Sequence, residues 1–384
     1  MSETLINSLI MASILIFMGV TMGITPYIVR KNVFFGVTLP ESANNRADIR
    51  LFKRQFLIVN ILLSLIGIAS LFLVFLFDFT VEQQNYFVIW SGIISLIVFM
   101  IMSFMSYYYF YRKVTKLKVR EFNTMKDQSD ARLMVATNFR KGDKPLIIAN
   151  KWLIGLGLII TVITAGAPIL YFDSIPDQVP TNFDFSGNPT VFIDKSVGVF
   201  MIIPIIQILT LPLMILSNYG IKGAKQNVKL KSPHVSLEQN RAYRYAWSKY
   251  MVSVTIITLI ILGCVQLAMM NLFIDMKMFL IIILALMVLL LGGTFYLMIK
   301  YGQGGERYQG KNVEQKEGIN QTIDEDIYWK LGIFYYNPND PSVFIEKRFG
   351  IGTTFNYARW QTWGIMFGII IVTIIMTVLP LWLM

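Results

Sequence analysis

The sequence predicts an all-α membrane protein with eight transmembrane helices, because it combines long apolar runs with a strictly alternating placement of basic residues. Each of eight apolar runs approaches or exceeds the ~20 residues that a helix needs to cross a hydrocarbon core of ~30 Å. Of the 384 residues, 55% are hydrophobic, and the mean hydropathy is +0.57. The runs cover residues 5–29, 56–77, 87–109, 152–171, 197–217, 250–273, 278–299 and 360–383.

Basic residues predict the orientation of these helices. All of the 34 Lys and Arg residues except Lys195 and Lys277 lie in four alternate gaps, at 30–54, 112–151, 222–249 and 300–359. The positive-inside rule places these gaps in the cytoplasm and both termini outside. The formal net charge of +11 is therefore expected to attract the anionic lipid of the inner leaflet, and direct nucleic-acid binding is not expected.

The same pattern orders the chain into six segments. The first apolar run is interpreted as a retained helix and not as a signal peptide, because Glu3 precedes it and Arg30 and Lys31 follow it. Residues 1–111 hold three helices and a basic inner loop, residues 112–151 form a basic cytoplasmic loop, and residues 152–217 form a helix-loop-helix unit with an ordered outer loop. Residues 218–299 hold a basic inner loop and two helices, residues 300–359 form a cytoplasmic hairpin module, and residues 360–384 form the last helix.

Within the apolar runs there is no Asp, Glu, Lys, Arg or His between the ends. Transporters driven by proton or sodium gradients generally need such groups at depth, so ion-coupled transport is disfavoured. Pro204 and Pro212 in the fifth run leave open a path for a neutral or lipidic substrate beside kinked helices. The simpler interpretation of these prolines is helix packing.

The sequence predicts no metal site and no cofactor. His234 is the only histidine, and Cys264 is the only cysteine, so neither has a second ligand of its kind. A serine nucleophile would lack a base on the outer face. Gly350 and Gly352 are not followed by the residues of a phosphate-binding loop.

The longest outer loop has the sequence of an ordered cap. Three prolines restrict its backbone, and residues 179–185 alternate as a short strand would. We expect Asp184 or Asp194 to pair with Lys195. A lid over the fourth and fifth helices and a recognition surface both remain open. The candidate ligand or partner residues are Pro180, Asn182, Asp184, Gly187, Asn188, Pro189, Asp194 and Lys195.

A second segment, residues 328–356, predicts a small cytoplasmic β-hairpin. A tight turn at 337–341 separates aromatic and β-branched runs. Its aromatic residues are alternatively explained by a place at the bilayer interface. A similar stretch at 35–40 suggests that the two loops pack together. The candidate residues are Trp329, Tyr335, Asn337, Pro338, Asp340, Pro341, Lys347, Arg348, Gly350, Gly352 and Asn356, with Lys347 and Arg348 expected to bind lipid phosphate or an acidic partner.

The outer-loop pattern at 175–189, followed by Asp194 and Lys195, resembles the short membrane domain of bacterial SdpI-type toxin-immunity proteins. This chain has Asn182 where that family favours His, and Thr190 where it favours Asp. The segment with Trp329 and the 337–341 turn looks like a second uncharacterised module of Gram-positive membrane proteins.

The resemblance implies a non-enzymatic protein of the bacterial plasma membrane. It would give immunity to, or sense, an extracellular membrane-active peptide, and would pass the signal to a cytoplasmic regulator. Two alternatives stay open. The first is a transporter or flippase of a lipidic or peptide substrate. The second is an intramembrane enzyme, which convergence of the outer-loop aspartates on one cleft would favour.

Overall fold

Eight long helices dominate the computed structural model, which describes residues 3–121, 145–183, 189–225, 233–270, 276–308 and 325–383. All eight are long and apolar enough to cross a membrane, so the prediction is confirmed and the chain is a multi-pass membrane protein. The helices are α1 (Glu3–Ile28), α2 (Ala47–Phe72), α3 (Val81–Glu121), α5 (Asn150–Leu170), α6 (Val197–Gly223), α7 (Pro233–Met269), α8 (Met276–Tyr301) and α9 (Trp360–Leu383).

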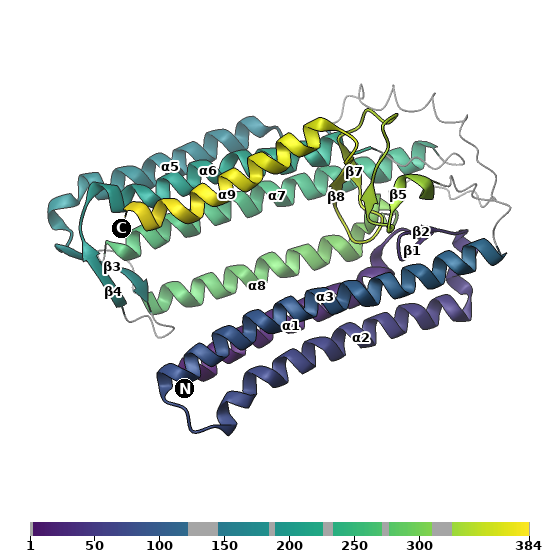
Figure 1. Cartoon of the computed structure of the whole chain (residues 1–384). Helices are drawn as coiled ribbons and strands as arrows, with labels where there is room; N and C mark the ends of the chain where they lie inside the picture. The colour runs from purple at the N-terminus through teal and green to yellow at the C-terminus, as the bar shows by residue number, and fades with distance from the viewer. Residues whose placement is uncertain are drawn as a thin grey trace.

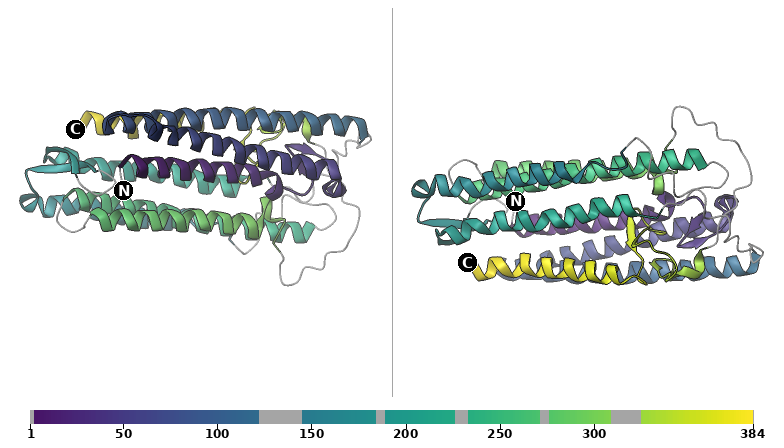
Figure 2. Two further views of the ribbon diagram at one scale, coloured as in Figure 1. Left: turned by 90° about the horizontal axis from the view of Figure 1, so that it is seen from below. Right: turned by 90° about the horizontal axis from the view of Figure 1, so that it is seen from above.

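The helices form two groups (Figure 1). One contains α1, α2 and α3, and the other contains α5, α6, α7 and α9, while α8 runs beside α7 on the side that faces the first group (Figures 1 and 2). Gly19 and Gly23 let α1 approach α2 closely, because a Cβ at Gly19 would lie 2.5 Å from the Ser64 hydroxyl. Gly157 similarly brings α5 against Leu211 of α6.

Several polar side chains inside the helices bond to neighbouring helices, where a bilayer offers no water as a partner. The Ser103 hydroxyl of α3 donates to Asn60 Oδ1 of α2 at 2.6 Å. Gln207 of α6 donates to the carbonyl of Leu259 in α7 at 2.8 Å. Gln266 of α7 in turn donates to the carbonyl of Phe200 in α6 at 3.0 Å. These contacts fix α6 against α7 at two levels.

At one end of the molecule the β3–β4 hairpin caps the second group of helices (Figure 1). Strands β3 (Gln178–Phe183) and β4 (Pro189–Asp194) pair antiparallel, so the predicted structure of this loop, with its short strand, is confirmed in the residues described. Val179 is fully buried and packs with Val199 and Phe200 of α6 and with Met270. The hairpin is therefore a packed extension of the helices.

We call the other end the basic end, since the described parts of the four basic gaps lie there. It carries three short antiparallel strand pairs in two places (Figure 1). Strands β1 (Val33–Phe34) and β2 (Val37–Thr38) form a hairpin after α1. Residues 325–359, which we call the C-terminal module, hold β5 (Trp329–Lys330), β6 (Phe334–Tyr335), β7 (Phe344–Glu346) and β8 (Thr353–Phe355), paired as β5–β6 and β7–β8.

The predicted β-hairpin structure is thus present, but its turns lie at other residues than predicted. The turn at 337–341 does not join paired strands; it links one hairpin to the next. The turn of the first hairpin is at Leu331 and Gly332, whose φ angles of 53° and 71° are both positive. Such turns usually carry Asn-Gly or Asp-Gly, so Leu-Gly gave a weaker signal than the prolines that follow.

Candidate functional site

The C-terminal module has an aromatic core of its own. Tyr335 is fully buried, Trp329 is 5% exposed, and both pack with Ile345. The two rings lie 5.1 Å apart, and the Arg348 guanidinium lies over the Trp329 ring at 5.1 Å. These two aromatics therefore belong to the interior of the module, whereas Phe334 and Tyr336 are exposed.

Asn356 holds the 337–341 turn in place. Its Oδ1 accepts from the backbone of Asn337 at 3.1 Å, and its Nδ2 donates to the carbonyls of Asn337 and Asp340 at 2.9 and 3.1 Å. The Tyr335 hydroxyl donates to Asp340 Oδ2 at 2.8 Å. Burial raises the pKa of Tyr335 to about 12, so this hydroxyl remains a donor at neutral pH. The predicted polar residues of the turn therefore form one connected network.

Lys225, directly after α6, attaches that helix to the module. Its backbone N–H donates to the carbonyl of Phe344 at 2.9 Å. Its Nζ lies 2.8 Å from Asp340 and 3.2 Å from Glu325. Burial alone would lower the pKa of Lys225, but the two carboxylates outweigh it and raise the pKa above its ordinary value. The Asp340 carboxyl, although burial opposes this, has its pKa lowered by the hydrogen bond from Lys225.

Glu346 of β7 connects the module to α1 and α7, and through Arg244 to the end of α6. Its carboxylate forms a buried ion pair with Arg30, just after α1, and accepts from Asn240 of α7 at 2.9 Å. Arg244 Nη2, also from α7, lies 3.7 Å from the same carboxylate. Arg244 additionally donates to carbonyls at the end of α6, at 2.7 Å for both Lys222 and Ala224. These bonds satisfy carbonyls that a helix end leaves without a partner.

Asp326 makes the corresponding connection to the first three helices. It accepts from the Thr38 hydroxyl at 2.7 Å and pairs with Lys118 of α3 at 2.7 Å and with Arg348. Burial would raise the pKa of Asp326, but the positive charges of Arg348 and Lys118 lower it. Arg348 also donates to the carbonyl of Gly36 at 3.2 Å. Arg348 therefore serves a contact within the chain, which corrects its expected role as a surface cation for lipid or a partner.

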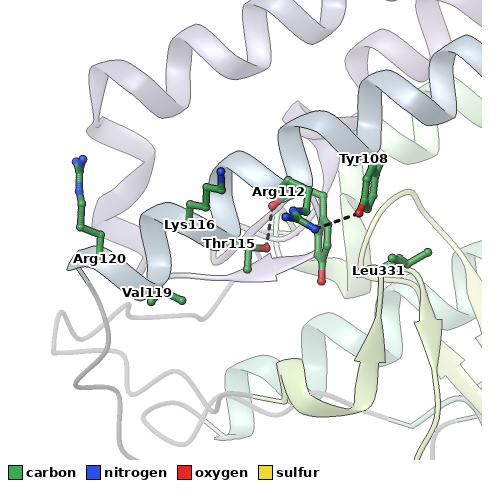
Figure 3. A pocket seen from close by; sticks show the side chains of 8 residues that line it. Tyr108, Arg112, Thr115, Lys116, Val119, Arg120 and Leu331 are labelled. Atoms are coloured by element: carbon green, nitrogen blue, oxygen red, sulfur yellow. Dashed lines mark hydrogen bonds between the residues drawn. The ribbon is translucent and has the colours of Figure 1, made fainter.

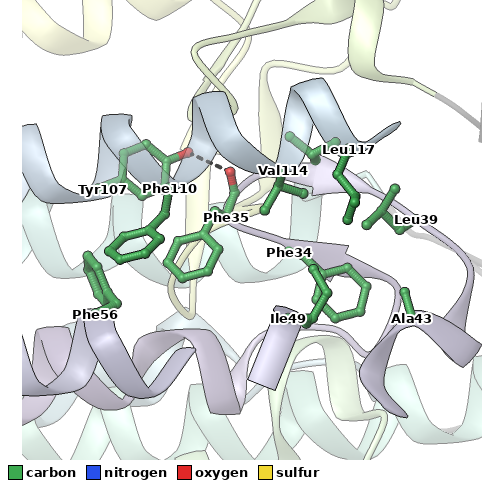
Figure 4. Close-up of a cluster of buried hydrophobic side chains, with 11 residues drawn as sticks. Phe34, Phe35, Leu39, Ala43, Ile49, Phe56, Tyr107, Phe110, Val114 and Leu117 are labelled. Atoms are coloured by element: carbon green, nitrogen blue, oxygen red, sulfur yellow. Dashed lines mark hydrogen bonds between the residues drawn. The ribbon is translucent and has the colours of Figure 1, made fainter. Parts of the chain in front are cut away.

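The β1–β2 and β5–β6 turns meet backbone to backbone, which confirms that the two loops pack together. A Cβ at Gly36 would lie 2.6 Å from the carbonyl oxygen of Gly332, so no side chain fits between them. The Tyr107 hydroxyl of α3 donates to the Leu331 carbonyl at 2.9 Å. The Phe35 ring enters the buried cluster between α2 and α3 (Figure 4).

A basic groove runs along the end of α3 beside this contact (Figure 3). Its cavity has a volume of about 670 Å³, and its lining includes Arg112, Lys116 and Arg120 of α3 together with Leu331 of the module. The three cations are exposed on one face of α3. Of their contacts, Arg112 donates to the Tyr108 hydroxyl at 3.2 Å and Arg120 pairs with Glu121. The groove offers positive charge to an acidic surface.

The outer-loop candidates lie at the opposite end, far from the module. Lys195 pairs with Asp177 at 3.1 Å and donates to the Ile175 carbonyl at 2.9 Å. Within the described residues the ion pair of Lys195 is thus with Asp177 and not with the expected Asp194, while the other expected partner, Asp184, lies outside those residues. Pro180 is buried and Pro189 is exposed. Candidates Asp184, Gly187 and Asn188 lie outside the described residues, and so does the side chain of Asn182.

The remaining module candidates have simpler places. Lys347 is exposed, and Pro338 and Pro341 are exposed in the turn. Gly350 and Gly352 have φ angles of 93° and 109° in the β7–β8 connection, where a side chain would be strained. Within the described ranges, His, Cys, Asp and Glu form no group of three that could hold a metal ion.

Several residues that build the site gave no signal in the sequence. Arg30, Asn240 and Arg244 looked like ordinary members of basic or polar loops, and Asp326 and Glu346 looked like solvated acids. Their partners lie far away along the chain, 316 residues in the case of Arg30 and Glu346. The alternating charge of the loops identifies the end of the molecule at which these residues lie. It does not show which of them bond to one another.

Two models of known families match parts of the chain. Residues 159–208 match a domain of unknown function (DUF1648), and residues 338–363 match a family of unknown function (DUF5808). The first match spans most of α5, the β3–β4 hairpin and the first half of α6, and the second spans the β7–β8 half of the module. The comparisons with curated proteins and with solved structures found no match.

Proposed function

We propose that this chain is a non-enzymatic bacterial envelope protein that senses, or gives immunity to, a membrane-active peptide and relays its presence to a cytoplasmic regulator. One observation carries the proposal: α6 joins the β3–β4 hairpin directly to the C-terminal module. Ser196 caps the first turn of α6, where it accepts from the Val199 backbone at 3.2 Å. Lys225 ties the other end of α6 to β7 and Asp340.

The hairpin has the chemistry to receive such a peptide. Val191 and Phe192 on β4 are 43% and 50% exposed. Exposed aspartates at 173, 177 and 194 surround the hairpin, so an amphipathic cationic peptide would meet both apolar and acidic surface. Because the base of the hairpin packs on α6, a peptide that displaces the hairpin would also shift that helix.

The other end has the chemistry to hold a regulator. The groove beside the module presents Arg112, Lys116 and Arg120, which would attract an acidic segment of a cytoplasmic protein. Its wall includes Leu331, in the turn that meets the β1–β2 hairpin. Movement of the module would therefore change the shape of the groove.

An assay in cells tests this proposal. Cells that lack the gene are complemented with the wild type or with Phe192→Ala, Lys195→Ala or Lys116→Glu, and are challenged with a panel of cationic amphipathic peptides. Survival should fall for Phe192→Ala and Lys195→Ala with at least one peptide. Cells with Lys116→Glu should lose the change in transcription by which the regulator responds to that peptide. Arg54→Gln, a charge change at an exposed position away from the groove, is the control. Equal survival of deletion and complemented strains across the panel would reject the proposal.

A transporter or flippase is a second candidate, favoured by one feature of α6 and α7. The Oε1 atoms of Gln207 and Gln266 are buried between these helices without a hydrogen-bond donor among the described residues. Buried acceptors of this kind can serve a polar substrate. Translocation of a fluorescent lipid in proteoliposomes, abolished in Gln207→Leu, would favour transport over sensing.

A further inference from the structure

A second cavity at the basic end lies where the first three helices approach the end of α8. It has a volume of about 380 Å³ and is lined by residues at the end of α1, in the loop that follows, near the start of α2 and directly after α8. Tyr27 and Ile28 are the last residues of the α1 span, and Tyr301 ends α8. The cavity therefore lies at the depth where lipid headgroups meet these helices.

Positive charge dominates its lining. The lining contains four cations, Arg30, Lys31, Lys53 and Arg307, and two carboxylates, Glu41 and Glu306. Arg30 already forms an ion pair with Glu346. Of the two carboxylates, Glu306 accepts a bond from the backbone N–H of Lys31 at 3.1 Å. In the part of the chain that the structure describes, the side chains of Lys31, Lys53 and Arg307 have no carboxylate within ion-pair distance.

Neutral groups hold two of these cations, Lys53 and Arg307, in place. Lys53 Nζ donates to Asn44 Oδ1 at 3.0 Å and lies 5.0 Å from the centre of the Phe34 ring. Arg307 donates to the carbonyl of Tyr27 at 2.5 Å. A cation whose partners are all neutral gains a strong, charge-assisted hydrogen bond when an anion binds. The arrangement is a preformed site for an anion.

We propose that this cavity binds a phosphate group, with Lys31, Lys53 and Arg307 as its ligands. Phosphate is the anion that several converging cations recognise best, and an arginine can bind two of its oxygens at once. An anionic phospholipid of the leaflet at the basic end is the source that the depth of the cavity favours. This site is distinct from the groove along α3 and does not depend on the proposed sensing role.

Native mass spectrometry of the full chain tests the site. The protein is reconstituted in phosphatidylcholine nanodiscs with or without phosphatidylglycerol, and the lipid retained after release is counted. Wild type should retain phosphatidylglycerol in preference to phosphatidylcholine. Lys53→Gln and Arg307→Gln should each weaken that retention about fivefold, as expected for about 1 kcal/mol per cation near an anionic headgroup.

Arg54→Gln is the matched control, because it removes the same charge one residue away at an exposed position outside the cavity lining. Arg307→Lys, which keeps the charge, should retain phosphatidylglycerol better than Arg307→Gln does. Unchanged retention in both cavity variants, or an equal loss in Arg54→Gln, would overturn the proposal. Titration with glycerol 3-phosphate in phosphatidylcholine nanodiscs distinguishes the sources, since tight binding lost in Lys53→Gln would assign the same phosphate site to a soluble ligand.

Discussion

Arg30 and Glu346 form a buried ion pair that joins the end of α1 to strand β7, 316 residues further along the chain. Both side chains are less than 10% exposed, at 9% and 4%. The pair lies where the first three helices, α7 and the C-terminal module meet. The module therefore acts as a clamp between two helix groups.

Glu346→Ala should be strongly destabilising. The change leaves Arg30 buried without its anion and removes the acceptor of Asn240, and breaking a buried pair of this kind costs about 3–5 kcal/mol. Thermal unfolding in detergent should show a large fall in Tm. Glu121→Gln, which removes the carboxylate of the partly exposed pairs with Arg46 and Arg120, should lower Tm far less. A Tm that is the same for both variants would contradict the clamp.

Gly332→Ala should separate the two turns without unfolding the helices. The added Cβ would lie 2.7 Å from the Tyr107 hydroxyl and 2.9 Å from Gly36 Cα, and the positive φ adds strain. Limited proteolysis should then cut the module faster. Gly364→Ala on α9, where a Cβ would meet nothing within 4 Å, should behave as the wild type.

Acid should loosen the module through Asp326. The pKa of this carboxyl lies below its ordinary value of 3.8 in the folded protein. Its contribution to stability is therefore fully present above that value and is lost as the pH falls through the folded pKa. Asp326→Asn should remove this part of the dependence of Tm on pH, whereas Asp78→Asn, at an exposed position, should retain the wild-type acid profile. An unchanged profile in Asp326→Asn would exclude this role.

The orientation of the chain is open to a labelling test. In a Cys264→Ser background, cysteines at Ser186 and Asn339 should react with an impermeant thiol reagent from outside and only after permeabilisation, respectively. The reverse pattern would show that the basic end faces outward.

The helices could be predicted from the sequence because a bilayer permits few structures for a long apolar run. The cap was predictable for a similar reason, since Pro180 and its neighbours restrict the backbone. The clamp was not, because pairing Glu346 with Arg30 requires knowing which loops meet in space. The hairpin turn at Leu331 and Gly332 was overlooked because positive φ at a leucine is uncommon and leaves no strong signature.

Photocrosslinking from residue 349 tests the clamp most directly. The Phe349 ring lies 4.4 Å from Tyr107, 5.9 Å from Phe56 and 6.1 Å from Phe35, so a benzoylphenylalanine there keeps the aromatic character of the position. A protease site inserted between residues 309 and 324 then separates the module from all helices before α9.

After illumination in native membranes and cleavage, the two fragments should remain joined, and mass spectrometry should find the link in peptides that contain residues 35, 56 or 107. The same probe at exposed Phe334, which packs on Tyr357 within the module, should leave the fragments separate. Fragments that separate equally from both positions, or links confined to α5–α7, would contradict the account.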